Sequence, residues 1–131
     1  NKFPVLVGGE HSISLGAVNA CTGRYPDLSV LQISAHANLK EGPENDKFNQ
    51  SSVAYHIYKA LPEPKLTSVA VRNISKAEAD WMEAEQPQIN LFWARNQEKW
   101  NISEIISTLS DNVYLSIDLN ALDCGVMPAV S

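Results

Sequence analysis

The stretch that decides the fold class is Leu28-Ser29-Val30-Leu31-Gln32-Ile33-Ser34-Ala35-His36-Ala37-Asn38. Its first six residues are rich in Val, Leu and Ile, which is typical of a parallel strand covered on both faces. Polar side chains that can bind ligands follow directly, and ligands of open parallel sheets bind beyond the carboxyl ends of the strands. The stretch therefore predicts a buried strand that brings Ser34, His36 and Asn38 to one end of a sheet.

Outward from this stretch, short apolar runs alternate with helical patterns along the chain. This alternation is typical of a parallel sheet with crossover helices. The expected strands cover residues 3–7, 28–33, 66–71, 89–94 and 113–119. The expected helices cover residues 12–21, 52–61 and 75–85, and a fourth runs from residue 101 to about residue 110. We expect one α/β domain over residues 1–131, with three αβα layers and a mainly parallel sheet.

The helix expected from residue 75 has a clear start signal. Ser75 and Glu78 have the spacing of a capping box, in which each side chain binds a free backbone N–H group of the other residue. The sequence therefore predicts that this helix begins directly after Ser75.

The composition is that of a chain that can form a real core. It has 131 residues, of which 44% are hydrophobic, and its formal net charge is -5. Without clustered Lys and Arg, this charge argues against nucleic acid or an anionic membrane as a partner. Cys21 and Cys124 belong to no C-x-x-C pair, so we interpret both as reduced thiols. No apolar run approaches the roughly 20 residues that cross a bilayer, and we expect a cytoplasmic protein.

Three polar segments follow the ends of separate expected strands. His11, His36 and Asp118 have side chains that can bind metals, and each alone has an ordinary explanation as a structural histidine or a turn cap. Because the segments lie at the same end of one sheet, we expect these three side chains to converge. Two imidazoles and a carboxylate suit one Zn, Mn or Fe ion with open positions for water. The segments are Gly8-Gly9-Glu10-His11-Ser12, Ser34-Ala35-His36-Ala37-Asn38 and Ser116-Ile117-Asp118-Leu119-Asn120.

In order and spacing, the three segments resemble the metal motifs of the ureohydrolase family, which includes arginases, agmatinases, guanidinobutyrases and formiminoglutamases. The family motifs read G-G-D-H-S, D-A-H-x-D and S-x-D-x-D, and this chain has GGEHS, SAHAN and SIDLN. The segment from Val69 to Ser75 also resembles the family's G-I-R segment. The resemblance implies an arginase-like fold, of which this chain is the central portion, truncated at both ends. It also implies hydrolysis of guanidino-type carbon centres by two manganese ions, and a homo-oligomer.

The resemblance places metal-ligand roles on His11, His36 and Asp118, and Asp118 is also the candidate catalytic residue. The family has aspartates at three further ligand positions, which are occupied here by Ser34, Asn38 and Asn120. Two divalent cations need several carboxylates for charge balance, and uncompensated buried charge costs several kcal/mol per ion. We therefore expect one divalent metal ion or none.

Two functional hypotheses follow. The first is an impaired or non-catalytic ureohydrolase domain, and the second is a one-metal hydrolase of a guanidino or formimino C–N bond. Gln50 lies in the long loop where the family has a proton-transferring histidine, and glutamine cannot transfer protons. A small guanidino-type molecule is the expected ligand in both cases. The family's substrate-binding glutamate would follow Ser131, so we assign no substrate-binding residue.

Overall fold

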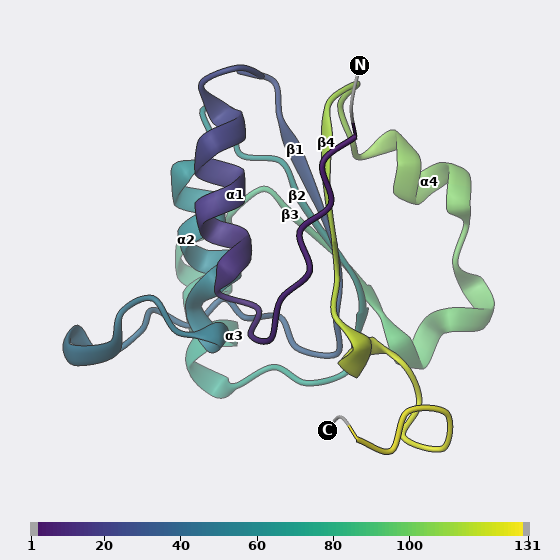
Figure 1. The fold of residues 1–131 in the computed structure, drawn as a ribbon. Helices are drawn as coiled ribbons and strands as arrows, with labels where there is room; N and C mark the ends of the chain where they lie inside the picture. Colours follow the sequence, from purple (N-terminus) through teal and green to yellow (C-terminus); the bar gives the residue numbers. More distant parts are fainter. Residues whose placement is uncertain (1–2, 130–131) are drawn as a thin grey trace.

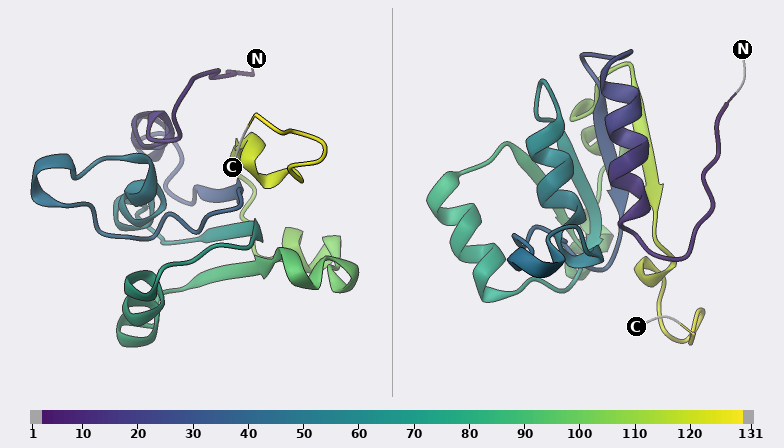
Figure 2. Two further views of the ribbon diagram at one scale, coloured as in Figure 1. Left: turned by 90° about the horizontal axis from the view of Figure 1, so that it is seen from below. Right: turned by 60° about the vertical axis from the view of Figure 1, so that its left-hand side comes forward.

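The computed structural model describes residues 3–129. Its centre is a four-stranded parallel sheet with the strand order β3-β2-β1-β4. Three helices cover one face of the sheet and α4 lies on the other, which gives three αβα layers (Figures 1 and 2). The strands are β1 (Ser29–Ile33), β2 (Leu66–Val71), β3 (Ile89–Trp93) and β4 (Val113–Ile117). The helices are α1 (Ile13–Thr22), α2 (Val53–Ala60), α3 (Lys76–Glu85) and α4 (Ile102–Ser107).

The order of the strands explains both helical layers. The chain moves outward from β1 through β2 to β3, and then returns to the other side of β1 to form β4. Crossover connections between parallel strands are right-handed, so reversing the direction of travel moves the connecting helix to the opposite face. This is why α4 lies apart from α2 and α3. The reversal also makes the carboxyl ends of β1 and β4 the place where such sheets bind ligands.

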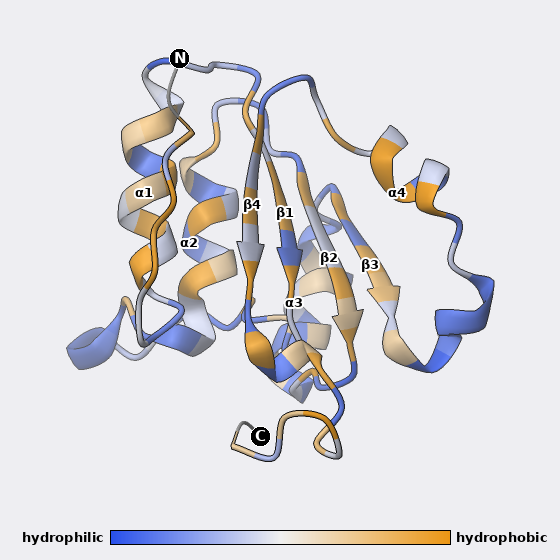
Figure 3. Ribbon diagram, turned by 45° about the vertical axis from the view of Figure 1, so that its right-hand side comes forward, coloured by the Kyte–Doolittle hydropathy of each residue, from blue (hydrophilic) through white to orange (hydrophobic). Residues whose placement is uncertain are grey.

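The main core lies between the sheet and α2. Every residue of β2 is buried, as expected for a central strand covered on both faces. Val53, Ala54 and Ile57 of α2 are buried against Leu66 and other core residues, which is the spacing of one helix face. Figure 3 shows apolar segments within the central strands and the hydrophilic loop between β1 and α2 projecting from the layers. No helix in residues 3–129 combines the length and apolar character that a membrane span requires.

One expected strand is wrong. Residues 3–7 have no strand structure, and no backbone hydrogen bond joins them to β4 in the described part of the chain. Their side chains are largely exposed, with Phe3 at 87% and Val7 at 88%. An apolar run becomes a strand only where a neighbour satisfies its backbone N–H and C=O groups. The other expected strands and helices are confirmed to within a few residues at their ends.

Ala70 gives β2 an irregular backbone. Its φ of 71° lies in the left-handed region, and the register with β3 shifts between Val69 and Val71. A side chain disfavours this conformation by about 1–2 kcal/mol, whereas glycine adopts it freely. In the segment that resembles the family's G-I-R, Ala70 takes the place of the glycine.

We expect Ala70→Gly to leave the free energy of unfolding within about 0.5 kcal/mol of the parent, because relief of backbone strain offsets the loss of a buried methyl group. The control is Ala79→Gly on the exposed surface of α3, which should lose about 1 kcal/mol. Urea denaturation measures both. Equal losses in the two variants would show that Ala70 is unstrained.

Candidate functional site

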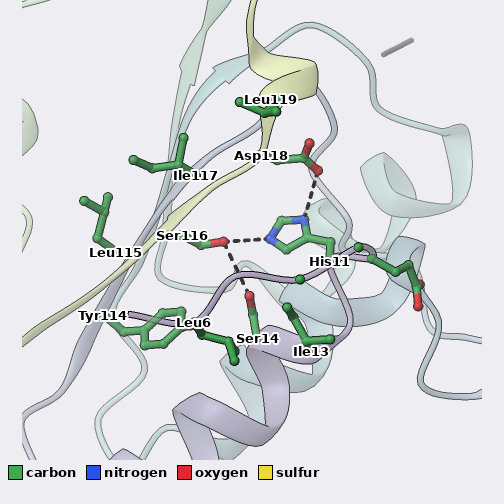
Figure 4. Close-up of a pocket in the computed structure, with 13 residues that line it drawn as sticks. Leu6, His11, Ile13, Ser14, Tyr114, Leu115, Ser116, Ile117, Asp118 and Leu119 are labelled. Carbon is green, nitrogen blue, oxygen red and sulfur yellow. Dashed lines mark hydrogen bonds and ion pairs between the residues drawn. The ribbon is translucent and has the colours of Figure 1, made fainter. Parts of the chain in front are cut away.

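The carboxyl ends of β1 and β4 lie side by side. Ile33 pairs with Ile117, and the backbone N–H of Asp118 donates to the carbonyl of Ile33 over 2.9 Å. The SAHAN and SIDLN segments therefore leave the sheet at neighbouring points. The loop that leads into α1 brings His11 to the same place, where its ring lies between Ser116 and Asp118 (Figure 4).

His11 has contacts at both ring nitrogens. Its Nε2 lies 2.9 Å from Ser116 Oγ, and its Nδ1 lies 3.2 Å from Asn38 Nδ2 and 3.5 Å from Asp118 Oδ2. Its side chain is only 6% exposed. Burial lowers the pKa of His11 below the ordinary histidine value, although the negative charges of Asp118 and Glu10 oppose this effect. The ring is therefore held mainly in its neutral form at pH 7.

His36 is held through Asn120. The amide Nδ2 of Asn120 lies 3.1 Å from His36 Nδ1, while its Oδ1 accepts from the backbone N–H of Ala35 over 2.9 Å. Ser34 Oγ donates to the same oxygen over 3.2 Å. Since a backbone N–H can only donate, the amide oxygen must face Ala35 and the amide nitrogen must face His36.

A cavity of about 250 Å³ lies beside the cluster of His11, Ser116 and Asp118, between the segment that precedes α1 and the exposed side of β4. Gly8, Gly9 and Glu10 line one side, and Ser116 and Asp118 line the other. Glu10 accepts from Ser12 Oγ over 2.6 Å. The cluster therefore borders a space that a small molecule can enter, with Asp118 as a carboxylate at its edge.

Comparisons with known proteins identify the family of this chain. The whole of residues 1–131 matches the model of the Arginase family. The chain belongs to the arginase family. It is 35% identical to an N(1)-aminopropylagmatine ureohydrolase of Synechocystis, over 98% of this chain and 42% of the relative. It is 29% identical to an agmatinase of Bacillus cereus, over 98% of this chain and 43% of the relative.

Solved structures lead to the same family. The agmatine ureohydrolase of Thermoplasma volcanium superposes with a TM-score of 0.77 at 26% identity, covering 92% of this chain and 41% of that one. The ureohydrolase resemblance and the arginase-like α/β fold are thus confirmed. This chain spans less than half the length of these relatives.

The side chains of this arginase-family chain do not fit the pair of manganese ions that the family implies. Within residues 3–129, no three or more His, Cys, Asp or Glu side chains come together as a metal-binding group. Asp118 is the sole carboxylate among the six positions that correspond to family ligands, and its Oδ1 accepts from the backbone N–H of Asn120. Hard divalent cations need charged oxygen ligands, so one carboxylate cannot balance two of them.

Ser116, His11 and Asp118 lie in the order of a Ser-His-Asp triad, but their hydrogen bonds do not suit that chemistry. As the Asn38 amide is oriented, its Nδ2 faces His11 Nδ1 at 3.2 Å, closer than Asp118 Oδ2 at 3.5 Å, which favours the tautomer with the ring proton on Nε2 and Ser116 Oγ as its acceptor. A triad needs the opposite tautomer, in which Nε2 takes the proton of the serine. Ser116 is also only 9% exposed. We therefore do not assign a serine nucleophile in this arginase-family site.

Two residues that support the site were missed from the sequence. Arg72 Nη2 donates to the backbone carbonyl of Asn120 over 2.8 Å, which holds the turn after β4. Glu78 Oε1 accepts from the backbone N–H of Leu39 over 2.8 Å, directly after Asn38. Arg72 had a signal, because it lies in the segment that resembles G-I-R. Nothing in the sequence indicates the contact between Glu78 and Leu39, because the capping box accounts only for the bonds that Glu78 makes with Ser75.

Proposed function

We propose that this chain is an arginase-family ureohydrolase domain whose two-metal hydrolysis is impaired or absent. The observation that carries the proposal is the set of side chains around Asp118. Asn38 and Asn120 face the two histidine rings and Ser34 donates to Asn120, at positions where the family has carboxylates. The molecule expected at the cavity is a small guanidino compound, since the names of the similar relatives include agmatinase. As the family resemblance implies, we also propose that the chain assembles as a homo-oligomer.

The chemistry of guanidinium hydrolysis supports the proposal. A guanidinium carbon is stabilised by resonance and needs a strong nucleophile, and in the family the metal pair supplies hydroxide by lowering the pKa of water. In this chain Asp118 accepts hydrogen bonds and can attract a cationic guanidino group to the cavity. The amides of Asn38 and Asn120 face Nδ1 of the two histidines, so neither ring offers a free lone pair there to take a proton from water.

Proton transfer is also unsupported. Gln50 cannot carry a proton, and it belongs to a short 3-10 turn (Gln50–Ser52) before α2. The nearest histidine along the chain, His56, already lies 2.9 Å from the carbonyl of Lys47 through its Nε2, and its ring is tilted against that of Phe48. It therefore has a local structural role.

A second candidate is hydrolysis of the same C–N bond with one metal ion. It is favoured by the contact between His11 Nδ1 and Asp118 Oδ2, which places an imidazole and a carboxylate 3.5 Å apart at the edge of the cavity. His36 would complete the ligand set. In this case a single ion would have to displace the asparagine amides from the ring nitrogens.

We expect the protein, after incubation with manganese and desalting, to retain less than one equivalent of the metal and to release no urea from agmatine. Elemental analysis and a colorimetric urea assay measure the two quantities. His36→Ala and the matched variant His56→Ala should behave like the parent in both assays.

The result that supports the one-metal alternative is one equivalent of metal with urea release that His36→Ala abolishes and His56→Ala preserves. Two tightly held equivalents of manganese would contradict both candidates, because the charge argument forbids a pair of ions here.

A further inference from the structure

We infer that Ser34, Asn38 and Asn120, which replace the family's aspartates, form a metal-independent clamp around His11 and His36. In this clamp the asparagine amides occupy the imidazole lone pairs that a cation would need. This goes beyond the proposed loss of hydrolysis, because it assigns the replacing residues a role of their own. It predicts a specific tautomer for each histidine, and it stands or falls separately from any measurement of activity.

The argument is strongest at His36. A neutral imidazole has one nitrogen that carries a proton and one that offers a lone pair. The N–H of Ala35 fixes the orientation of the Asn120 amide, so its NH₂ group faces His36 Nδ1 at 3.1 Å. That group can only donate. The lone pair of His36 is therefore at Nδ1, where the amide already uses it, and the proton is at Nε2.

At His11 a different asparagine faces the ring, and its amide orientation is part of the inference because no backbone N–H fixes it. Asn38 Nδ2 lies 3.2 Å from His11 Nδ1, closer than Asp118 Oδ2 at 3.5 Å, and Ser116 Oγ lies 2.9 Å from Nε2, where it would accept the ring proton. Asn38 has a φ of 56°, a left-handed conformation that asparagine tolerates better than most residues. Two lone pairs are thus filled by two amides in one cluster.

The backbone around Asn38 gives its side chain little freedom to withdraw. Its carbonyl accepts from the N–H groups of Ala54 and Tyr55 at the start of α2, over 3.0 and 3.1 Å. The next N–H, that of Leu39, is held by Glu78. The donor to His11 is therefore anchored by two helices.

The clamp joins parts of the chain that are far apart in sequence. His11 and Ser116 are separated by 105 residues, His36 and Asn120 by 84, and His11 and Asn38 by 27. These bonds connect the start of α1 to the ends of β1 and β4. A metal ion holds such ends by charge, whereas neutral amides hold them by hydrogen bonds and need no cation.

The test is nitrogen-15 NMR of the imidazole rings in the uniformly labelled protein at about pH 8, where ordinary histidines are neutral. We expect His11 and His36 both to show a protonated Nε2 and an unprotonated Nδ1. His56 is the internal reference, because its Nε2 faces the carbonyl of Lys47 and must carry the proton. In Asn120→Asp, a carboxylate replaces the donor, so His36 should change to the Nδ1–H tautomer while His11 keeps its own.

The parent protein alone can overturn the inference. A protonated Nδ1 at His11 or His36 would contradict it, as would broadening of their ring signals by substoichiometric manganese together with a higher melting temperature. Melting temperatures that agree within about 1 °C in chelator and in manganese would support it. Absence of urea release bears only on the proposed function, so the two ideas fail on different measurements.

Discussion

Replacing Ser34, Asn38 and Asn120 together by aspartate is expected to lower the free energy of unfolding by about 3–5 kcal/mol in metal-free buffer. Ser34 is fully buried and Asn38 nearly so. The new carboxylates would lie near Asp118 and near one another, and like charges in a poorly solvated cluster repel strongly. The two asparagine donors to the imidazoles would be lost at the same time.

Manganese should reverse this effect. The variant would present four carboxylates and two histidines at the positions of the family's ligands, which is the charge that two divalent ions require. Binding to the folded state adds about 2.7 kcal/mol when the free metal is about 100 times its dissociation constant. Denaturation curves in chelator and in manganese give both numbers, and elemental analysis counts the ions.

A matched control has the same change in net charge at exposed positions. Asn19, Asn96 and Ser103 are all exposed, and their triple replacement by aspartate should cost less than about 1 kcal/mol and should not respond to manganese. If manganese stabilised the parent protein as strongly as it stabilises the cluster variant, the present side chains would already suffice for the metal. The account of charge balance would then be wrong.

The second large effect is expected from Glu78→Ala, at about 2–4 kcal/mol of lost stability. Glu78 is 7% exposed and accepts from the N–H of Leu39 at 2.8 Å, and from the N–H and hydroxyl of Ser75 at 2.7 and 2.6 Å. Removing it leaves the buried N–H of Leu39 without a partner, at about 1–3 kcal/mol, and breaks a helix cap worth about 1 kcal/mol.

Urea denaturation of Glu78→Ala beside Glu83→Ala measures this loss. Glu83 lies on the same helix α3 and is exposed, so its removal should stay within about 0.5 kcal/mol of the parent. Because Leu39 follows Asn38, the Glu78 variant should also disturb the ring signals of His11. Equal stability of the two variants would show that the contact with Leu39 contributes nothing.

Ser75 and Glu78 show what a local sequence pattern can and cannot predict. The spacing of Ser75 and Glu78 predicts the start of α3, and the structure confirms it as a capping box. The pattern says nothing of Leu39, because that contact spans 39 residues and depends on where the loop after β1 passes. Residues 3–7 illustrate the opposite failure, since an apolar run predicts a strand but cannot supply the neighbour that a strand needs.

Residue type, order and spacing are enough to predict the family, the βα alternation and the absence of carboxylates at three ligand positions. What takes the place of the missing charge depends on how the chain folds. Hydrogen bonds have direction, so the partner of each ring nitrogen depends on the register of β1 with β4 and on the orientation of one amide beside Ala35. Those are facts of three-dimensional packing, and no local pattern in GGEHS, SAHAN or SIDLN contains them.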